Sequence, residues 1–127
     1  MSHQPSEKPE IDFPEGPPPA DLEITDLTEG DGAEAATGDT AVVHYVGVSY
    51  STGEEFDASW NRGQTFAFPL GAGNVIAGWD RGVVGMKVGG RRRLVIPPHL
   101  GYGDRGAGAV IKPGETHIFV VDLVDVR

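Results

Sequence analysis

Short stretches of alternating apolar and polar residues, or of β-branched and aromatic residues, follow one another along most of this chain and predict β-strands. Leu22 to Thr25 alternates, and residues 40–50 carry the densest β-branched run. A turn at 51–53 ends in glycine and indicates a hairpin. The remaining strands are predicted over residues 54–57, 65–69, 90–97 and 115–126. Parallel strands would need helical crossovers that the pattern lacks, so we expect antiparallel pairing.

One stretch, from about Val75 to Gly85, predicts a helix. Val75, Trp79 and Val83 recur at i, i+4 and i+8, which places them on one helix face. Three glycines interrupt the stretch and lower its helix propensity, so the helix must depend on packing around Trp79. Periodicity alone indicates that this apolar face belongs to the core.

Length and composition predict one small domain. The chain has 127 residues, enough for one hydrophobic core, and no cysteine, which excludes disulfides and thiolate chemistry. No basic leader followed by an apolar run opens the sequence, and no apolar stretch of about 18 residues could span a bilayer. We therefore expect a cytoplasmic protein without a membrane partner, and a monomer.

Charge divides the chain unevenly. Residues 1–39 carry eleven acidic residues against one lysine, whereas the remainder is almost balanced. Six of the ten prolines lie within the first twenty residues. We predict an acidic, proline-rich, disordered tail over 1–20, more typical of a solubilising segment than of an interaction arm, and a folded domain over 21–127.

The sequence does not contain the motifs of most familiar catalytic centres. The serines lack a nucleophile elbow, and the glycines near residue 73 lack the βαβ unit or lysine of a nucleotide site. Arg91, Arg92 and Arg93 could contact nucleic acid, but in an acidic chain a solvated strand is the better interpretation. The four histidines do not have metal-ligand spacing. We predict no metal, no cofactor and no nucleic-acid partner.

Five motifs taken together are more specific than any one of them. They are Val43-His44-Tyr45-Val46-Gly47, Gly53-Glu54-Glu55-Phe56-Asp57, Phe66-Ala67-Phe68, Gly73 to Asp80, and Tyr102-Gly103 with Thr116-His117-Ile118-Phe119. In this order and spacing, from about Leu22 to Arg127, the chain resembles the FKBP-type peptidyl-prolyl cis-trans isomerases, a family that also binds the macrolide tacrolimus.

The resemblance implies an α+β fold, in which a curved antiparallel sheet, a half-barrel, wraps around one short helix. It also implies an enzyme that rotates X–Pro bonds in proline-containing polypeptides. Macrolides such as tacrolimus or rapamycin would occupy its pocket. An apolar aromatic pocket suits that reaction. The planar X–Pro amide is more dipolar than its twisted transition state, so desolvation penalises the ground state more.

Matching each residue to the family's motifs assigns roles around this pocket. Trp79 would form the floor, and Tyr102 and the Ile76 N–H would bind a substrate carbonyl. Asp57 and Arg62 would stand at the edge. The implied catalytic residues are Tyr45, Phe56, Asp57, Trp79, Tyr102 and Phe119, and the implied substrate-binding residues are Arg62, Phe66, Val75, Ile76, Val110 and Ile111, of which the last pair forms a lip.

The sequence is also compatible with other interpretations. Asp57 could cap a turn, and Tyr45, Phe66 and Phe119 could be ordinary core residues. The whole domain could be a non-catalytic module that binds proline segments or macrolides. A chaperone with a substrate-holding insertion is disfavoured, because the loop over 98–114 is too short to contain one.

The chain also departs from the family pattern. Lys112 replaces the first proline of the lip, and small residues at 107 and 108 replace a bulkier pair, so the lip should be looser and more basic. Trp60 stands where many relatives carry a polar residue and could be an exposed aromatic beside the pocket. His117 replaces an aliphatic residue on the strand of Phe119, which predicts a buried, neutral imidazole; the alternative is a histidine that reaches solvent at the end of the sheet.

Overall fold

A computed structural model of the chain describes residues 8–9, 11, 16–101 and 114–127. The strands are β1 (Glu23–Thr28), β2 (Thr40–Ser49), β3 (Glu55–Ala58), β4 (Phe66–Pro69), β5 (Arg91–Ile96) and β6 (His117–Val126). The helical elements are α1 (Ser59–Arg62), α2 (Ala77–Gly82) and the 3₁₀ turn η1 (Pro98–Leu100). Across the described residues, no helix has the length and apolar character needed to cross a membrane.

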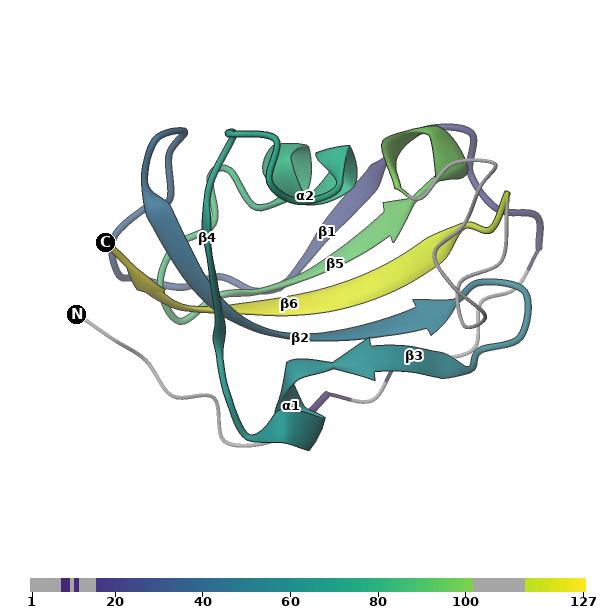
Figure 1. Ribbon diagram of the computed structural model, residues 1–127, viewed down its shortest axis with the longest axis horizontal. Coiled ribbons are helices and arrows are strands. Elements are labelled where there is room, and N and C mark those ends of the chain that lie inside the picture. The colour runs from purple at the N-terminus through teal and green to yellow at the C-terminus, as the bar shows by residue number, and fades with distance from the viewer. Residues whose placement is uncertain (1–7, 10, 12–15, 102–113) are drawn as a thin grey trace.

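The strands form one curved antiparallel sheet, as the sequence predicts. Their order is β1-β5-β6-β2-β3, and β4 pairs with the first part of β2. Figure 1 shows α2 lying over one face of this sheet. The longest pairing joins β2 to β6, with Tyr45 opposite Val121 and Gly47 opposite Phe119.

Two apolar clusters cover the two faces of the sheet. The larger lies under α2 and includes Trp79, Leu94 and Phe119. The smaller, here called the outer cluster, consists of the buried residues Val46, Val48, Ala58, Val95 and Ile118. Strands buried on both faces explain the nearly continuous apolar runs of β2 and β6, which simple alternation does not describe.

The predicted helix is shorter than its apolar pattern indicates. Val75 precedes α2 and Val83 is its C-cap, so the three-residue stripe is not one helical face. A Cβ at Gly78 would lie 2.6 Å from Ile96 Cγ2, and one at Gly82 would lie 2.7 Å from Leu94 Cδ2. These glycines weaken the helix and also allow it to lie directly on β5.

The expectation of a single helix was wrong. The chain forms a further helical turn, α1, between β3 and β4. It ends at Gly63, whose φ of 64° suits glycine and whose N–H donates to the Trp60 carbonyl. Only four residues form α1, too few for a 3.6-residue period to be recognised in the sequence.

The interpretation of the arginine run as a solvated strand was also wrong for two of its members. Arg91 Nε pairs with Asp122 Oδ1 at 2.7 Å, and Arg92 Nε pairs with Asp26 Oδ1 at 2.7 Å. Arg92 Nη1 also donates to the carbonyls of Gly82 and Val84. Arg92 therefore joins the C-terminal end of α2 to the edge strand β1.

Candidate functional site

An apolar cavity of about 480 Å³ opens between α2, the loop before it and the sheet. This volume is typical of small-ligand sites. Most of the side chains that line it are aromatic or aliphatic. The lining residues are Tyr45, Asp57, Phe66, Gly73, Asn74, Val75, Ile76, Trp79 and Phe119.

Trp79 lies at the centre of the aromatic side chains around the cavity. Its ring centroid is 4.9 Å from that of Tyr45 and 5.4 Å from that of Phe119, in both cases edge to face. Trp79 is 5% exposed, whereas Phe66, on the rim, is 38% exposed. Edge-to-face pairs of this kind add to the burial energy and fix the ring orientations. The cavity therefore has a rigid aromatic lining.

Gly47 makes room for two of these rings. It stands opposite Asp57 on β3 and Phe119 on β6. A Cβ at this position would lie 2.7 Å from Phe119 Cε1 and 2.8 Å from Phe56 Cζ. Phe56 consequently packs behind Phe119, with ring centroids 5.5 Å apart, and supports the cavity wall from behind.

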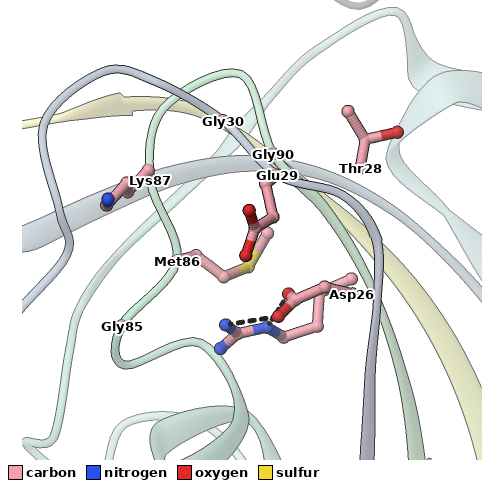
Figure 2. Close-up of a pocket in the computed structure, with 9 residues that line it drawn as sticks. Asp26, Thr28, Glu29, Gly30, Gly85, Met86, Lys87 and Gly90 are labelled. Atoms are coloured by element: carbon pink, nitrogen blue, oxygen red, sulfur yellow. Dashed lines mark hydrogen bonds and ion pairs between the residues drawn. The ribbon is translucent and has the colours of Figure 1, made fainter.

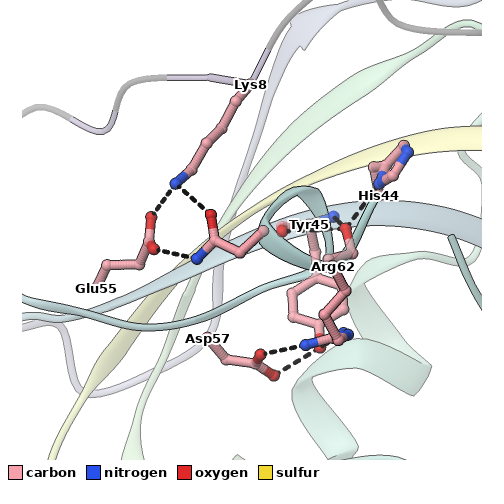
Figure 3. A network of polar contacts seen from close by, with 8 residues as sticks. Lys8, His44, Tyr45, Glu55, Asp57 and Arg62 are labelled. Atoms are coloured by element: carbon pink, nitrogen blue, oxygen red, sulfur yellow. Dashed lines mark hydrogen bonds and ion pairs between the residues drawn. The ribbon is translucent and has the colours of Figure 1, made fainter. Parts of the chain in front are cut away.

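Tyr45 and Asp57, at the edge of the cavity, bond to each other and to Arg62 beside it (Figure 3). The Tyr45 hydroxyl donates to Asp57 Oδ2 at 2.6 Å, and Arg62 donates to both Asp57 Oδ1 at 2.8 Å and the Tyr45 hydroxyl oxygen at 2.9 Å. Burial raises the pKa of Tyr45, and its hydrogen bond to Asp57 raises it further. The hydrogen bond with Tyr45 likewise raises the pKa of Arg62. Tyr45 is therefore a neutral donor, and Arg62 a permanent cation.

Ser59 fixes Tyr45 from the other side of β2. Its Oγ accepts a hydrogen bond from the Tyr45 N–H at 2.7 Å and lies 2.8 Å from His44 Nδ1. Burial lowers the pKa of His44. Trp60 stacks on His44 with ring centroids 4.3 Å apart and joins the outer cluster. It does not line the cavity, so its expected place beside the pocket was wrong.

Asp80 shapes the loop before α2. Its Oδ1 accepts from the Gly71 N–H at 2.8 Å, and its Oδ2 accepts from the Gly73 N–H at 3.0 Å. Both glycines have positive φ, 83° and 77°. These bonds hold the turn that presents Val75 and Ile76 to the cavity. Ile76 precedes α2, where backbone N–H groups have no intrahelical partner.

The structure brings together seven of the twelve residues that the resemblance assigns to the site. Arg62 lies beside them, bonded to Asp57 and Tyr45, and Phe56 lies behind Phe119. The other three, Tyr102, Val110 and Ile111, lie outside the described residues. The seven that line the cavity are Tyr45, Asp57, Phe66, Val75, Ile76, Trp79 and Phe119.

The structure also decides whether Asp57 caps a turn and whether Tyr45 and Phe119 are ordinary core residues. Asp57 bonds to the side chains of Tyr45 and Arg62, which is not the arrangement of a turn cap. Tyr45 and Phe119 are core residues as well as cavity residues, since they are 7% and 2% exposed.

Sequence reasoning missed the residues that support the site. Ser59 accepts a hydrogen bond from the backbone of Tyr45, and Asp80 accepts one from the turn before α2. Gly47 leaves space for aromatic rings of the cavity wall. Asp80 could have been noticed as a carboxylate near the start of a predicted helix that follows two glycines. Nothing local in the sequence marks Ser59 or Gly47, because their partners lie on other strands.

A second, smaller hollow of about 70 Å³ lies between β1 and the loop after α2 (Figure 2). Arg92 and Asp26, which line it, are bonded to each other. We assign this hollow to the joint between α2 and β1, not to ligand binding.

Comparison with known proteins identifies related chains. A model of the family "FKBP-type peptidyl-prolyl cis-trans isomerase" matches residues 32–124. An FK506-binding protein of Streptomyces anulatus is 70% identical over 121 residues, which cover 94% of this chain and 98% of that one. A probable FK506-binding protein of Corynebacterium glutamicum is 55% identical over 118 residues, covering 93% and 98%. The crystal structure of AtFKBP13 matches with a TM-score of 0.78 and 39% identity, covering 84% of this chain and 93% of that one.

Proposed function

Because this chain belongs to the FKBP-type peptidyl-prolyl cis-trans isomerase family, we propose that it catalyses rotation about X–Pro bonds in polypeptides. One observation carries the proposal. The aromatic cavity over Trp79 is apolar inside and has its polar groups at one edge, which suits a proline ring with a peptide chain entering from solvent.

The reaction needs a shaped apolar environment more than it needs an acid or a base. Partial double-bond character holds the X–Pro bond with a barrier of about 18–20 kcal/mol. The planar amide loses more solvation than the twisted transition state when both enter an apolar cavity, so the barrier falls. A barrier lower by about 7 kcal/mol gives roughly five decades in rate.

The residues divide this work between them. Trp79, Phe66, Val75 and Phe119 would enclose the proline ring and desolvate the amide. The Ile76 N–H would bind a substrate carbonyl and so fix one geometry of the bound chain. Tyr45, with Asp57 and Arg62, would hold the polar edge without exchanging protons, because the pKa of Tyr45 lies above its ordinary value.

Three further roles rest on the family resemblance. Tyr102 would offer its hydroxyl to a substrate carbonyl, and Val110 and Ile111 would form the lip of the pocket. The same cavity would accept tacrolimus or rapamycin. Macrolide binding is supported by the names of the relatives, which are FK506-binding proteins.

A protease-coupled isomerisation assay tests the proposal. The purified chain at micromolar concentration, without metal or nucleotide, is expected to accelerate cis-to-trans exchange in a short peptide with an apolar residue before proline. Tacrolimus should abolish that acceleration. An unchanged rate together with tacrolimus binding would favour the non-catalytic module, and neither acceleration nor binding would overturn the proposal.

A further inference from the structure

Lys8 contacts the domain at the corner where β3 meets α1. Its Nζ pairs with Glu55 Oε1 at 2.7 Å and donates to Asn61 Oδ1 at 3.0 Å. Asn61 Nδ2 in turn donates to Glu55 Oε2 at 2.8 Å. The three side chains form a closed ring of polar contacts that joins the two elements; Lys8 and Glu55 are labelled in Figure 3.

The same two elements supply the ion pair at the edge of the cavity. Asp57 follows Glu55 by two residues on β3, and Arg62 follows Asn61 directly on α1. Arg62 is the group that contacts both Asp57 and the Tyr45 hydroxyl. Any movement of α1 relative to β3 would therefore change the Asp57–Arg62 distance, and Lys8 bonds to both elements.

Neighbouring residues fix the position of Lys8. Pro9 is buried, and Ile11 packs against the outer cluster near Val46 and Val48. Further along, the Tyr50 hydroxyl donates to the Pro17 carbonyl at 3.1 Å. Lys8 is thus held at the corner beside Pro9 and Ile11, the two described residues next to it that lie near the outer cluster.

The electrostatics of Glu55 agree with this geometry. Burial acts to raise the pKa of Glu55, but hydrogen bonds from Lys8 and Asn61 outweigh burial and lower it. The side chains of Lys8 and Glu55 are 37% and 33% exposed, so the pair contributes little to global stability. Its effect should appear in the geometry of the corner.

We propose that Lys8 is a positioning residue of the site, which holds β3 and α1 so that Arg62 keeps its contacts with Asp57 and Tyr45. The inference rests on the proposed isomerase function. It makes part of the acidic N-terminal stretch a component of the enzyme.

The test compares Lys8→Met with Lys87→Met, which removes the same charge from an exposed lysine distant from this corner. Lys8→Met is expected to lower kcat/KM about three- to tenfold at an unchanged melting temperature. Glu55→Gln should cause a similar loss, and the double variant should lose no more than either single variant. Lys8→Arg, which keeps the charge, should restore most of the activity.

A second readout does not depend on activity. The side-chain N–H resonances of Arg62 should shift in Lys8→Met and stay in place in Lys87→Met. An inactive parent protein would overturn the proposed function, and the Arg62 resonances would still decide the positioning role. Equal kcat/KM in the two methionine variants, with unshifted Arg62 resonances, would overturn the role of Lys8.

Discussion

Trp79 belongs to the core and to the cavity at once. Its indole is 5% exposed and touches rings from β2, β4 and β6. Periodicity identifies it as a core residue, and only the comparison of motifs identifies it as a floor. The same is true of Tyr45 and Phe119, because a cavity lined by core side chains has the same apolar pattern as a core.

We expect Trp79→Ala to destabilise the domain by about 3–5 kcal/mol, because the surrounding rings cannot close the space that the indole leaves. Urea unfolding followed by far-UV circular dichroism measures the loss. Trp79→Phe, which keeps a ring, should cost clearly less. A loss below about 1 kcal/mol in the alanine variant would show that Trp79 is not tightly packed.

His117 predicts a pH dependence of stability. It is fully buried, and burial lowers its pKa, against a smaller opposing effect of Glu115. The unfolded chain, with a histidine pKa of about 6.5, takes up a proton before the folded chain does. The stability that neutral His117 contributes is therefore complete above about pH 6.5 and declines as the pH falls below it. His44, whose pKa burial also lowers, acts in the same direction.

Unfolding free energies from pH 7.5 down to 5 test this effect. The unfolding free energy of His117→Leu should rise relative to that of the parent protein as the pH falls, since the variant cannot be protonated at this position. His99→Leu, at an exposed position, is the matched control for the loss of a histidine. A parent-to-variant difference for His117→Leu that is constant over this range would contradict the prediction.

At the scale of elements, α2 owes its place to two glycines. In an exposed helix, glycine to alanine is expected to stabilise by about 1 kcal/mol. At Gly78 we expect the opposite, a loss of about 1–3 kcal/mol, because the new Cβ would lie 2.6–2.8 Å from three atoms of Ile96. Ile96 is fully buried, so its side chain has little free space to move into.

The double variant Gly78→Ala/Ile96→Val provides the control. Removing the Ile96 Cδ1 relieves part of the clash, so the two changes should cost less together than the sum of their separate costs. Simple additivity in chemical denaturation would mean that α2 shifts on β5 without contact with Ile96.

The strands were predictable and the helices less so, for physical reasons. Each strand carries enough β-branched or alternating residues to be recognised, and the predicted ends lie within a few residues of the observed ones. The helix α1 carries no period, and α2 is shortened because the chain before it forms the glycine turn that Asp80 holds. Contacts between elements therefore determine both the formation of α1 and the length of α2.

At the scale of the whole molecule, the order of the strands could not be predicted. β6 lies between β5, the strand before it, and β2, which is far from it in the sequence. Charge and proline content likewise predict a separate tail over residues 1–20, and that division stays a prediction. The contacts of Lys8, Pro9 and Ile11 with the sheet and α1 are features that composition does not indicate.

Removal of residues 1–11 distinguishes a detached tail from an N-terminal stretch that packs on the domain. A purely solubilising tail could be deleted without effect on unfolding. Because Ile11 packs against the outer cluster, we expect the truncated chain to lose about 1–2 kcal/mol of stability. Substitution of Ile11 by serine in the full chain should reproduce much of that loss. An unfolding curve that overlays the parent curve would favour the detached tail.

The central place of β6 also affects how the chain acquires its structure. β2 pairs along its length with a strand that begins about seventy residues after β2 ends, and most close contacts among the described residues join distant parts of the sequence. Such topologies close large loops before they gain contacts, so they fold slowly. During synthesis, β2 and β5 must wait until β6 has left the ribosome, with their apolar faces uncovered. A protein proposed to rotate X–Pro bonds in other chains thus passes through a long interval in which its own apolar faces are uncovered.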